Sequence, residues 1–186
     1  MKTLILIVIT AILAIWFPWI IFGIFYASFL EWNLHKHLMH TKRKWFPYPF
    51  RAHALVHHQI FKADETYHLQ RNEDKHTIPM AWWNGIVLAI IASIPIAIIG
   101  YLIGDYQSWL KVGATVYGYY IVYESMHFLM HLPEDKQPWW FKKFYIFRDL
   151  DARHHLHHLH MNTKNFNVLV WFWDWVFGTY ERPVLN

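Results

Sequence analysis

Three long apolar stretches, separated by polar ones, organise the chain. Residues 3–30 and 85–104 contain no charged side chain, and residues 108–123 contain only Lys111. About 20 consecutive apolar residues form a helix long enough to cross a bilayer. We therefore expect an all-α integral membrane helical bundle, with residues 1–186 forming one membrane-embedded domain and spans near these three stretches.

Two positions within this pattern determine the number of spans. Pro18 lies in the middle of the first stretch, where proline kinks or breaks a helix. This stretch is therefore either one span, which we favour, or two short re-entrant halves, so that the bundle has three or four spans. Gly104, Asp105 and Tyr106 predict a tight turn that joins the second and third stretches as a helical hairpin. The first stretch is longer than the apolar part of a signal peptide, and we expect it to be retained.

The basic residues predict the orientation of the chain. Of the 17 lysines and arginines, only Lys2 and Lys111 lie outside residues 31–84 and 124–186. Basic residues gather on the cytoplasmic side of membrane proteins. We therefore expect these two polar stretches to form one helical cap in the cytoplasm. The aromatic runs at Trp82, Trp139 and Trp171 either lie at the membrane interface, which we favour, or line an acyl tunnel. Residues 141–148 resemble an interfacial amphipathic stretch facing anionic headgroups.

Histidine is the residue type that indicates chemistry. All 15 histidines lie in the two polar stretches, and there is no cysteine, so imidazole must supply any ligation of Zn, Cu, Fe or Ni. Most fall into four boxes. The boxes contain His35 and His40; His53, His57 and His58; His127 and His131; and His154, His157 and His158.

Spacing within the boxes predicts that their imidazoles converge. Residues three or four apart share a helix face, as do His127 with His131 and His53 with His57. His154, His157 and His158 form another such face. His35 and His40 are five apart, about 140° on a regular helix. They could therefore chelate one ion only if the helix is distorted, but could serve two neighbouring ions. Ten imidazoles are too many for one metal ion and suit two. The remaining histidines, namely His37, His68, His76, His155 and His160, do not fit this spacing, and His155 and His160 are the likeliest replacements for a predicted ligand.

An acidic residue precedes three of the boxes by about one helical turn. Glu31 precedes His35, Glu124 precedes His127, and Asp151 precedes His154. Ligating histidines commonly donate their second ring N–H to a carboxylate, which is the role we expect for these acids. Glu124 could instead ligate directly, because Glu-x-x-His is the spacing of ferritin-like di-iron sites.

The four boxes and the end of the chain together resemble the fatty acid hydroxylase and sterol desaturase superfamily. The boxes read His-x4-His, His-x3-His-His, His-x3-His and His-x2-His-His, with the helical hairpin between the second and third. Residues 31–40 resemble the family's first box with its acidic lead residue. Residues 165–180 resemble its C-terminal signature, although Asn167 stands where the family usually has glycine and His155 is an uncommon insertion.

The resemblance implies a di-iron oxygenase that uses O2 on a lipid. Carried over to this sequence, it implies ten metal ligands: His35, His40, His53, His57, His58, His127, His131, His154, His157 and His158. We expect a lipid hydroxylase acting at the bilayer surface on a fatty acyl, sterol or related substrate, with two iron ions, for which zinc could substitute on purification. A lipid desaturase is the alternative within the same chemistry. A separate electron-donor protein is expected, and no nucleic-acid partner.

Other classes of protein fit the sequence less well. A metal transporter needs polar ligands within its spans, and these spans have almost none. A metalloprotease would contain His-Glu-x-x-His, and a serine hydrolase Gly-x-Ser-x-Gly; neither string is present. A His-rich protein that only handles metal remains the less favoured alternative.

Overall fold

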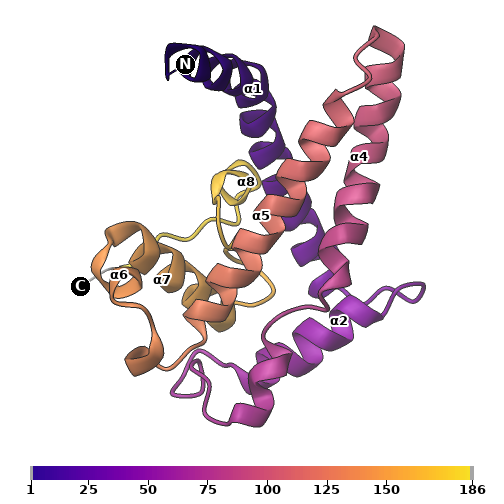
Figure 1. Cartoon of the computed structure of the whole chain (residues 1–186). Coiled ribbons are helices and arrows are strands. Elements are labelled where there is room, and N and C mark those ends of the chain that lie inside the picture. Colours follow the sequence, from indigo (N-terminus) through magenta and orange to yellow (C-terminus); the bar gives the residue numbers. More distant parts are fainter. Residues whose placement is uncertain (1, 185–186) are drawn as a thin grey trace. The chain divides into compact units, whose positions relative to one another are not determined.

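The structure is a computed structural model that describes the backbone of residues 2–184 and the side chains of residues 16–184. Every regular element in this part of the chain is helical, which confirms the predicted all-α class (Figure 1). The long helices are α1 (Lys2–Leu34), α4 (Trp83–Ile103), α5 (Ser108–Met130) and α7 (Tyr145–Leu159). The short ones are η1 (His35–Met39), α2 (Tyr48–Ala52), η2 (His53–His57), α3 (His58–Ile60), η3 (Asn72–Thr77), η4 (Glu134–Lys136), α6 (Trp139–Lys143) and α8 (Phe172–Val176).

The chain divides into two compact units. The hairpin unit comprises Met1–Ala27 and Ala81–Val122, and the histidine unit comprises Ser28–Met80 and Tyr123–Asn186. The boundaries fall inside α1 and α5, so each of these helices contributes to both units. All 15 histidines belong to the histidine unit.

The hairpin unit contains the predicted turn between α4 and α5. Gly104 ends α4 with a φ of 79°, a left-handed conformation that glycine adopts without steric cost. The carboxylate of Asp105 then accepts hydrogen bonds from the backbone N–H groups of Gln107 and Ser108 at 3.0 and 3.1 Å, and so caps the start of α5. The two helices approach closely at Gly85, where an added Cβ would lie 2.4 Å from the ring of Tyr120.

One helix in the part of the chain searched, α4, is long and apolar enough to cross a membrane. The bundle of three or four spans and the cytoplasmic cap remain predictions. Residues 3–15 of the first expected span have no described side chains, and α5 contains Lys111 and Glu124. Pro18 lies inside α1, which continues through it as one helix, and Figure 1 shows that this helix is bent.

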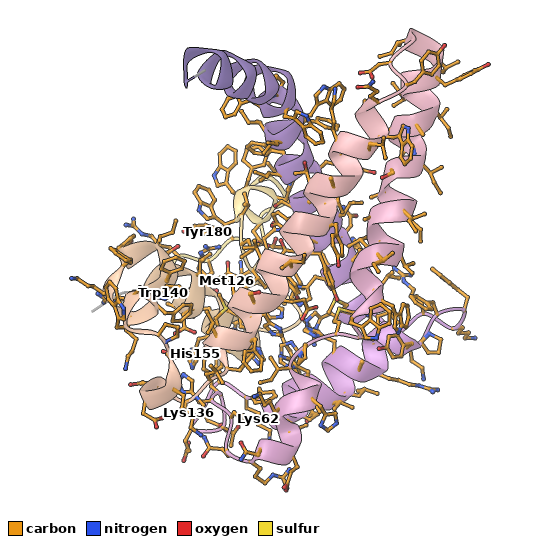
Figure 2. The ribbon with its side chains drawn as sticks, in the orientation of Figure 1. Lys62, Met126, Lys136, Trp140, His155 and Tyr180 are labelled. Atoms are coloured by element: carbon orange, nitrogen blue, oxygen red, sulfur yellow. The ribbon has the colours of Figure 1, made fainter. Side chains whose placement is uncertain are left out.

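The histidine unit has a small apolar core beside its imidazoles. Tyr123 and Met130 of α5 pack with Phe141 of α6 and Leu150 of α7. Val168 completes this cluster, and Met126 and Trp140, both labelled in Figure 2, pack against it. A second cluster joins Phe61, Leu69 and Ile78. These contacts link α5, α6, α7 and the loop after α3, and α5 with its end and α7 carry the third and fourth boxes.

Candidate metal centre

The ten box histidines form two clusters of five. The first cluster contains His35, His40, His53, His58 and His157; the second contains His57, His127, His131, His154 and His158. Within each cluster, one nitrogen from every ring lies within 4.8 Å of the others. The division into five and five agrees with the number expected from the sequence for two ions.

Two π-helical turns supply the pairs of the first cluster. In η1 the backbone N–H of His40 donates to the carbonyl of His35 at 3.0 Å, five residues back. In η2 the N–H of His58 donates to the carbonyl of His53 in the same way. A π-turn returns to the same face after five residues instead of four. His35 and His40 therefore share one cluster through the kind of helix distortion that chelation of a single ion was expected to require, and the alternative of two neighbouring ions is not the arrangement seen.

Ordinary α-helical spacing supplies the pairs of the second cluster. His127 and His131 lie four apart on α5 and its end, and His154 and His158 lie four apart on α7. His57 joins this cluster instead of staying with His53, and His157 joins the first cluster instead of staying with His154. The second and fourth boxes therefore each contribute to both clusters, which spacing along the sequence does not predict.

The ring nitrogens converge at distances that suit a shared ion. In the first cluster the Nε2 atoms of His35 and His53 are 2.8 Å apart, and those of His58 and His157 are 3.2 Å apart. In the second cluster the Nε2 atom of His154 lies 3.1 Å from that of His158. Metal–imidazole bonds of about 2.0–2.1 Å place neighbouring ligand atoms about 3 Å apart at right angles.

Burial keeps these imidazoles neutral. Nine of the ten are buried, and His40 is half-buried. Desolvation lowers the pKa of His35 to about 4, of His131 to about 3, and, with the neighbouring His35, of His40 to about 2. The pKa values of the other seven are lowered well below the usual 6.5, also mainly by desolvation. A neutral imidazole is the form that binds metal, so the clusters need no deprotonation at neutral pH.

Backbone carbonyls, not carboxylates, face the second nitrogen of five rings. The Nδ1 atom of His35 is hydrogen-bonded to the carbonyl of Phe166, and that of His157 to the carbonyl of Lys164 at 2.9 Å. The corresponding partners of His57, His131 and His158 are the carbonyls of Thr77, Tyr67 and Phe61, at 3.3, 2.8 and 2.6 Å. A carbonyl can only accept, so Nδ1 carries the hydrogen and Nε2 is left free to bind.

The three predicted carboxylates hold the segments that carry these carbonyls. Glu31 accepts from the N–H of Val168 at 2.6 Å, two residues after Phe166. Asp151 accepts from the hydroxyl of Tyr67 at 3.0 Å. Glu124 accepts from the N–H of Met80 at 3.2 Å, three residues after Thr77. At His35, where a bond to Glu31 was expected, the ring Nδ1 faces the carbonyl of Phe166, and Glu31 contacts the segment that carries this carbonyl.

The remaining five histidines lie outside both clusters. His155, labelled in Figure 2, is on α7 with its ring against Tyr67. His160 lies 3.7 Å from the carboxylate of Glu181, and His37 packs edge-on against Trp32. His68 packs against Tyr67 from the next position along the chain, and His76 hydrogen-bonds the carbonyl of Glu73.

Unpartnered nitrogens give a test of whether the clusters fit a metal. The Nε2 atoms of His57 and His127 are buried and have no hydrogen-bond partner among the residues that the structure describes. A buried polar atom without a partner costs about 1–3 kcal/mol. Both atoms belong to the second cluster, where a metal ion would satisfy them. The donor set of five neutral imidazoles suits Fe, Zn, Cu or Ni.

Comparison with known proteins identifies the family. The fatty acid hydroxylase family model matches residues 20–179, which is most of the chain and includes all ten clustered histidines. The chain belongs to the fatty acid hydroxylase family. No solved structure matches it significantly.

Curated relatives include one ceramide fatty acid hydroxylase and two dihydroceramide fatty acyl 2-hydroxylases. A ceramide very long chain fatty acid hydroxylase of Saccharomyces cerevisiae is 29% identical over 87% of this chain and 37% of its own length. Two dihydroceramide fatty acyl 2-hydroxylases of Arabidopsis thaliana are 24% and 26% identical, over 87% and 85% of this chain and 60% and 58% of their own lengths. The chain thus spans between about a third and three fifths of these relatives.

Several residues that shape the histidine clusters were missed in the sequence. The carbonyls of Phe166, Lys164 and Tyr67 carry no side-chain signal. Asp174 did offer one, because it is the only charged residue within the aromatic run of residues 171–177, and a lone acid there predicts a buried, partnered carboxylate. Asn167 stands where the family usually has glycine, a residue that often adopts a positive φ. In this chain the residue with a positive φ, 51°, is Asn165.

Proposed function

We propose that the chain is an O2-dependent di-iron hydroxylase acting on a C–H bond of a lipid acyl chain. The observation that carries this proposal is the pair of five-imidazole clusters in a member of the fatty acid hydroxylase family. When bound, two irons with O2 and two electrons would supply the oxidant that an unactivated C–H bond requires. The overall reaction consumes a C–H bond, O2, two electrons and two protons, and yields an alcohol and water.

The residues of the chain would act as fixed, neutral ligands. His35, His40, His53, His58 and His157 would hold one iron, and His57, His127, His131, His154 and His158 the other. Backbone carbonyls hydrogen-bonded to Nδ1 orient five of these rings, so that little reorganisation of the rings is needed when metal binds. Burial of the clusters excludes bulk water, which limits side reactions of a strong oxidant.

The names of the relatives support a fatty acyl chain carried by a ceramide as the substrate class. Two of them are described as acyl 2-hydroxylases, which favours the carbon next to the acyl carbonyl as the position attacked. The apolar helix α4 supports a location in the membrane, where such a substrate resides. A separate electron-donor protein would supply the reducing equivalents. Sterols and other lipids remain in the wider substrate class.

A lipid desaturase is the second candidate, because it would use the same imidazoles and the same co-substrates. The names of the relatives favour hydroxylation. A protein that only handles metal is less consistent with membership of this family.

Isotope labelling tests the proposal and separates its alternatives. The full chain, reconstituted with iron in lipid nanodiscs, would be given a dihydroceramide, a chemical reductant and ¹⁸O2. We expect a product 18 mass units heavier, from replacement of H by ¹⁸OH, and loss of this product in the His127→Ala variant. A product two units lighter would indicate a desaturase. Absence of any O2-dependent product with iron in both clusters would refute the oxygenase.

A further inference from the structure

Asp174 is a fully buried carboxylate at the start of α8, with an exposed fraction of 0%. It accepts hydrogen bonds from the backbone N–H groups of Phe166 and Asn167 at 2.9 and 2.7 Å, and from the hydroxyl of Thr179 at 2.7 Å. Desolvation raises its pKa, and these hydrogen bonds oppose the rise. Two of its three hydrogen bonds go to one short segment, which indicates that the position of that segment matters.

The segment that Asp174 holds is the one that orients two rings of the first cluster. The carbonyl of Phe166 faces Nδ1 of His35, and the carbonyl of Lys164 faces Nδ1 of His157. The N–H of Asn167 and the carbonyl of Phe166 belong to the same peptide group. A continuous chain of hydrogen bonds therefore runs from the Asp174 carboxylate, through one peptide group, to the imidazole of His35.

Glu31 holds the same segment from the end of α1. Its Oε1 atom accepts from the N–H of Val168 at 2.6 Å, and its Oε2 atom accepts from the side-chain amide of Asn167 at 3.2 Å. That amide also donates to the carbonyl of Ser28 at 2.8 Å. Residues 166–168 thus donate hydrogen bonds to two carboxylates, which lie 143 residues apart in the chain (174 minus 31).

We propose that Asp174 and Glu31 are positioning residues for the first cluster, acting through the peptide groups of residues 166–168. Asp174 does so by polarising the Phe166–Asn167 peptide group, which makes its carbonyl a stronger acceptor for the His35 Nδ1–H. A stronger acceptor fixes the tautomer of His35 and raises the basicity of its Nε2. The metal-binding part of this inference rests on the proposed function; the effect on the His35 N–H does not.

The metal-free full chain allows the first test. In ¹⁵N-histidine NMR spectra, the Nδ1–H of His35 should exchange with solvent slowly in the wild type and at least about tenfold faster in Asp174→Asn, in which the neutral amide polarises the peptide less. The Nδ1–H of His131, which faces the carbonyl of Tyr67, is the internal control and should be unchanged. Equal acceleration of both signals, or of neither, would overturn the proposal.

Cobalt(II) titration of the full chain provides the second test. We expect Asp174→Asn to weaken one of two binding events by roughly 10- to 100-fold, which is the range for groups that hydrogen-bond to metal ligands. The other binding event should be unchanged. Asp135→Asn, at an exposed acid in η4, is the matched control. His157→Gln and His127→Gln assign the two events to the first and second clusters.

The outcomes separate this inference from the proposed function. Fewer than two bound ions in the wild type would refute the di-iron proposal, while the NMR result would still decide the role of Asp174. Two ions with equal weakening of both, or of neither, in Asp174→Asn would overturn the positioning role alone. If Asp174→Asn does not fold, Glu31→Gln decides in the same two assays, because it removes the charge from the opposite side and leaves an acceptor for Val168.

Discussion

Among single residues, Asp151 gives a pH dependence whose sign can be worked out. Its carboxylate is largely buried on α7 and accepts from the hydroxyl of Tyr67. Burial raises the pKa of Asp151 from 3.8 to about 6, although the Tyr67 hydrogen bond opposes this. The folded protein therefore holds the proton more tightly than the unfolded chain. The stability that Asp151 contributes is fully present below pH 3.8 and is lost as the pH rises to about 6.

Asp151→Asn should therefore stabilise the metal-free protein at neutral pH. The amide oxygen can still accept from Tyr67, and no charge is buried. We expect its free energy of unfolding to match the wild type near pH 3.8 and to exceed it by on the order of 1–3 kcal/mol above pH 6. Unfolding temperatures in detergent across this range measure the difference, and subtracting the wild type removes the titration of the histidines. A variant less stable than the wild type at pH 8 would contradict this.

At the scale of the element, the sequence predicted the α-helical part of the clusters but not the π-helical part. His127 with His131, and His154 with His158, meet because four residues make one turn of a regular helix. His35 with His40, and His53 with His58, meet only because η1 and η2 contain an extra residue per turn. Apolar periodicity cannot reveal a single π-turn in so short a segment. The resemblance to the family implied these four residues as ligands but did not pair them.

The hydrogen-bond partners of the ring Nδ1 atoms could not be predicted from spacing along the sequence, for a different reason. His35 and Phe166 are 131 residues apart, and the contact uses a backbone carbonyl, which every residue has. The three acids precede boxes in the sequence, and in the structure they accept hydrogen bonds from N–H and O–H donors on neighbouring segments. Spacing along one helix places a carboxylate near an imidazole and does not determine which donor it meets after tertiary folding.

The stretch from α6 to the start of α7 gives a prediction about the membrane. Lys142, Lys143 and Arg148 are exposed beside exposed apolar side chains, with 64% of Tyr145 and 62% of Ile146 accessible. An exposed mixture of this kind suits the boundary between anionic headgroups and acyl chains. The chain has no cysteine, so a single nitroxide at Tyr145→Cys reports from this stretch alone.

In vesicles that contain anionic lipid, we expect this label to be accessible to O2 and protected from a water-soluble nickel chelate. A label at Glu65→Cys, in an exposed polar loop of the same unit, is the control and should be accessible to the chelate. Changing Lys142 and Lys143 to Glu should reduce the protection, since each basic residue near such a surface contributes about 1 kcal/mol. Equal chelate access at the two positions would place this stretch in water.

For the whole molecule, the open question is on which side of the membrane the histidines lie. The helix α4 can cross a bilayer, and the turn at Gly104 returns the chain along α5. If both helices cross, residues 31–80 and 124–184 share one side, which is what a set of ten imidazoles drawn from both segments requires. The distribution of basic residues predicts that this side is the cytoplasm.

Reporters inserted in the loops test this topology. A reporter at Asp105 should read extracytoplasmic, and one at Asp74, in the exposed η3, should read cytoplasmic. The two reporters together distinguish the alternatives. A protein inserted in the opposite orientation would exchange the two signals, whereas a hairpin that does not cross the membrane would give two cytoplasmic signals. Exchanged signals would mean that the basic residues do not set the orientation, and that electrons must arrive from the outer side. Two cytoplasmic signals would leave the clusters in place but remove the membrane-spanning hairpin between the second and third boxes.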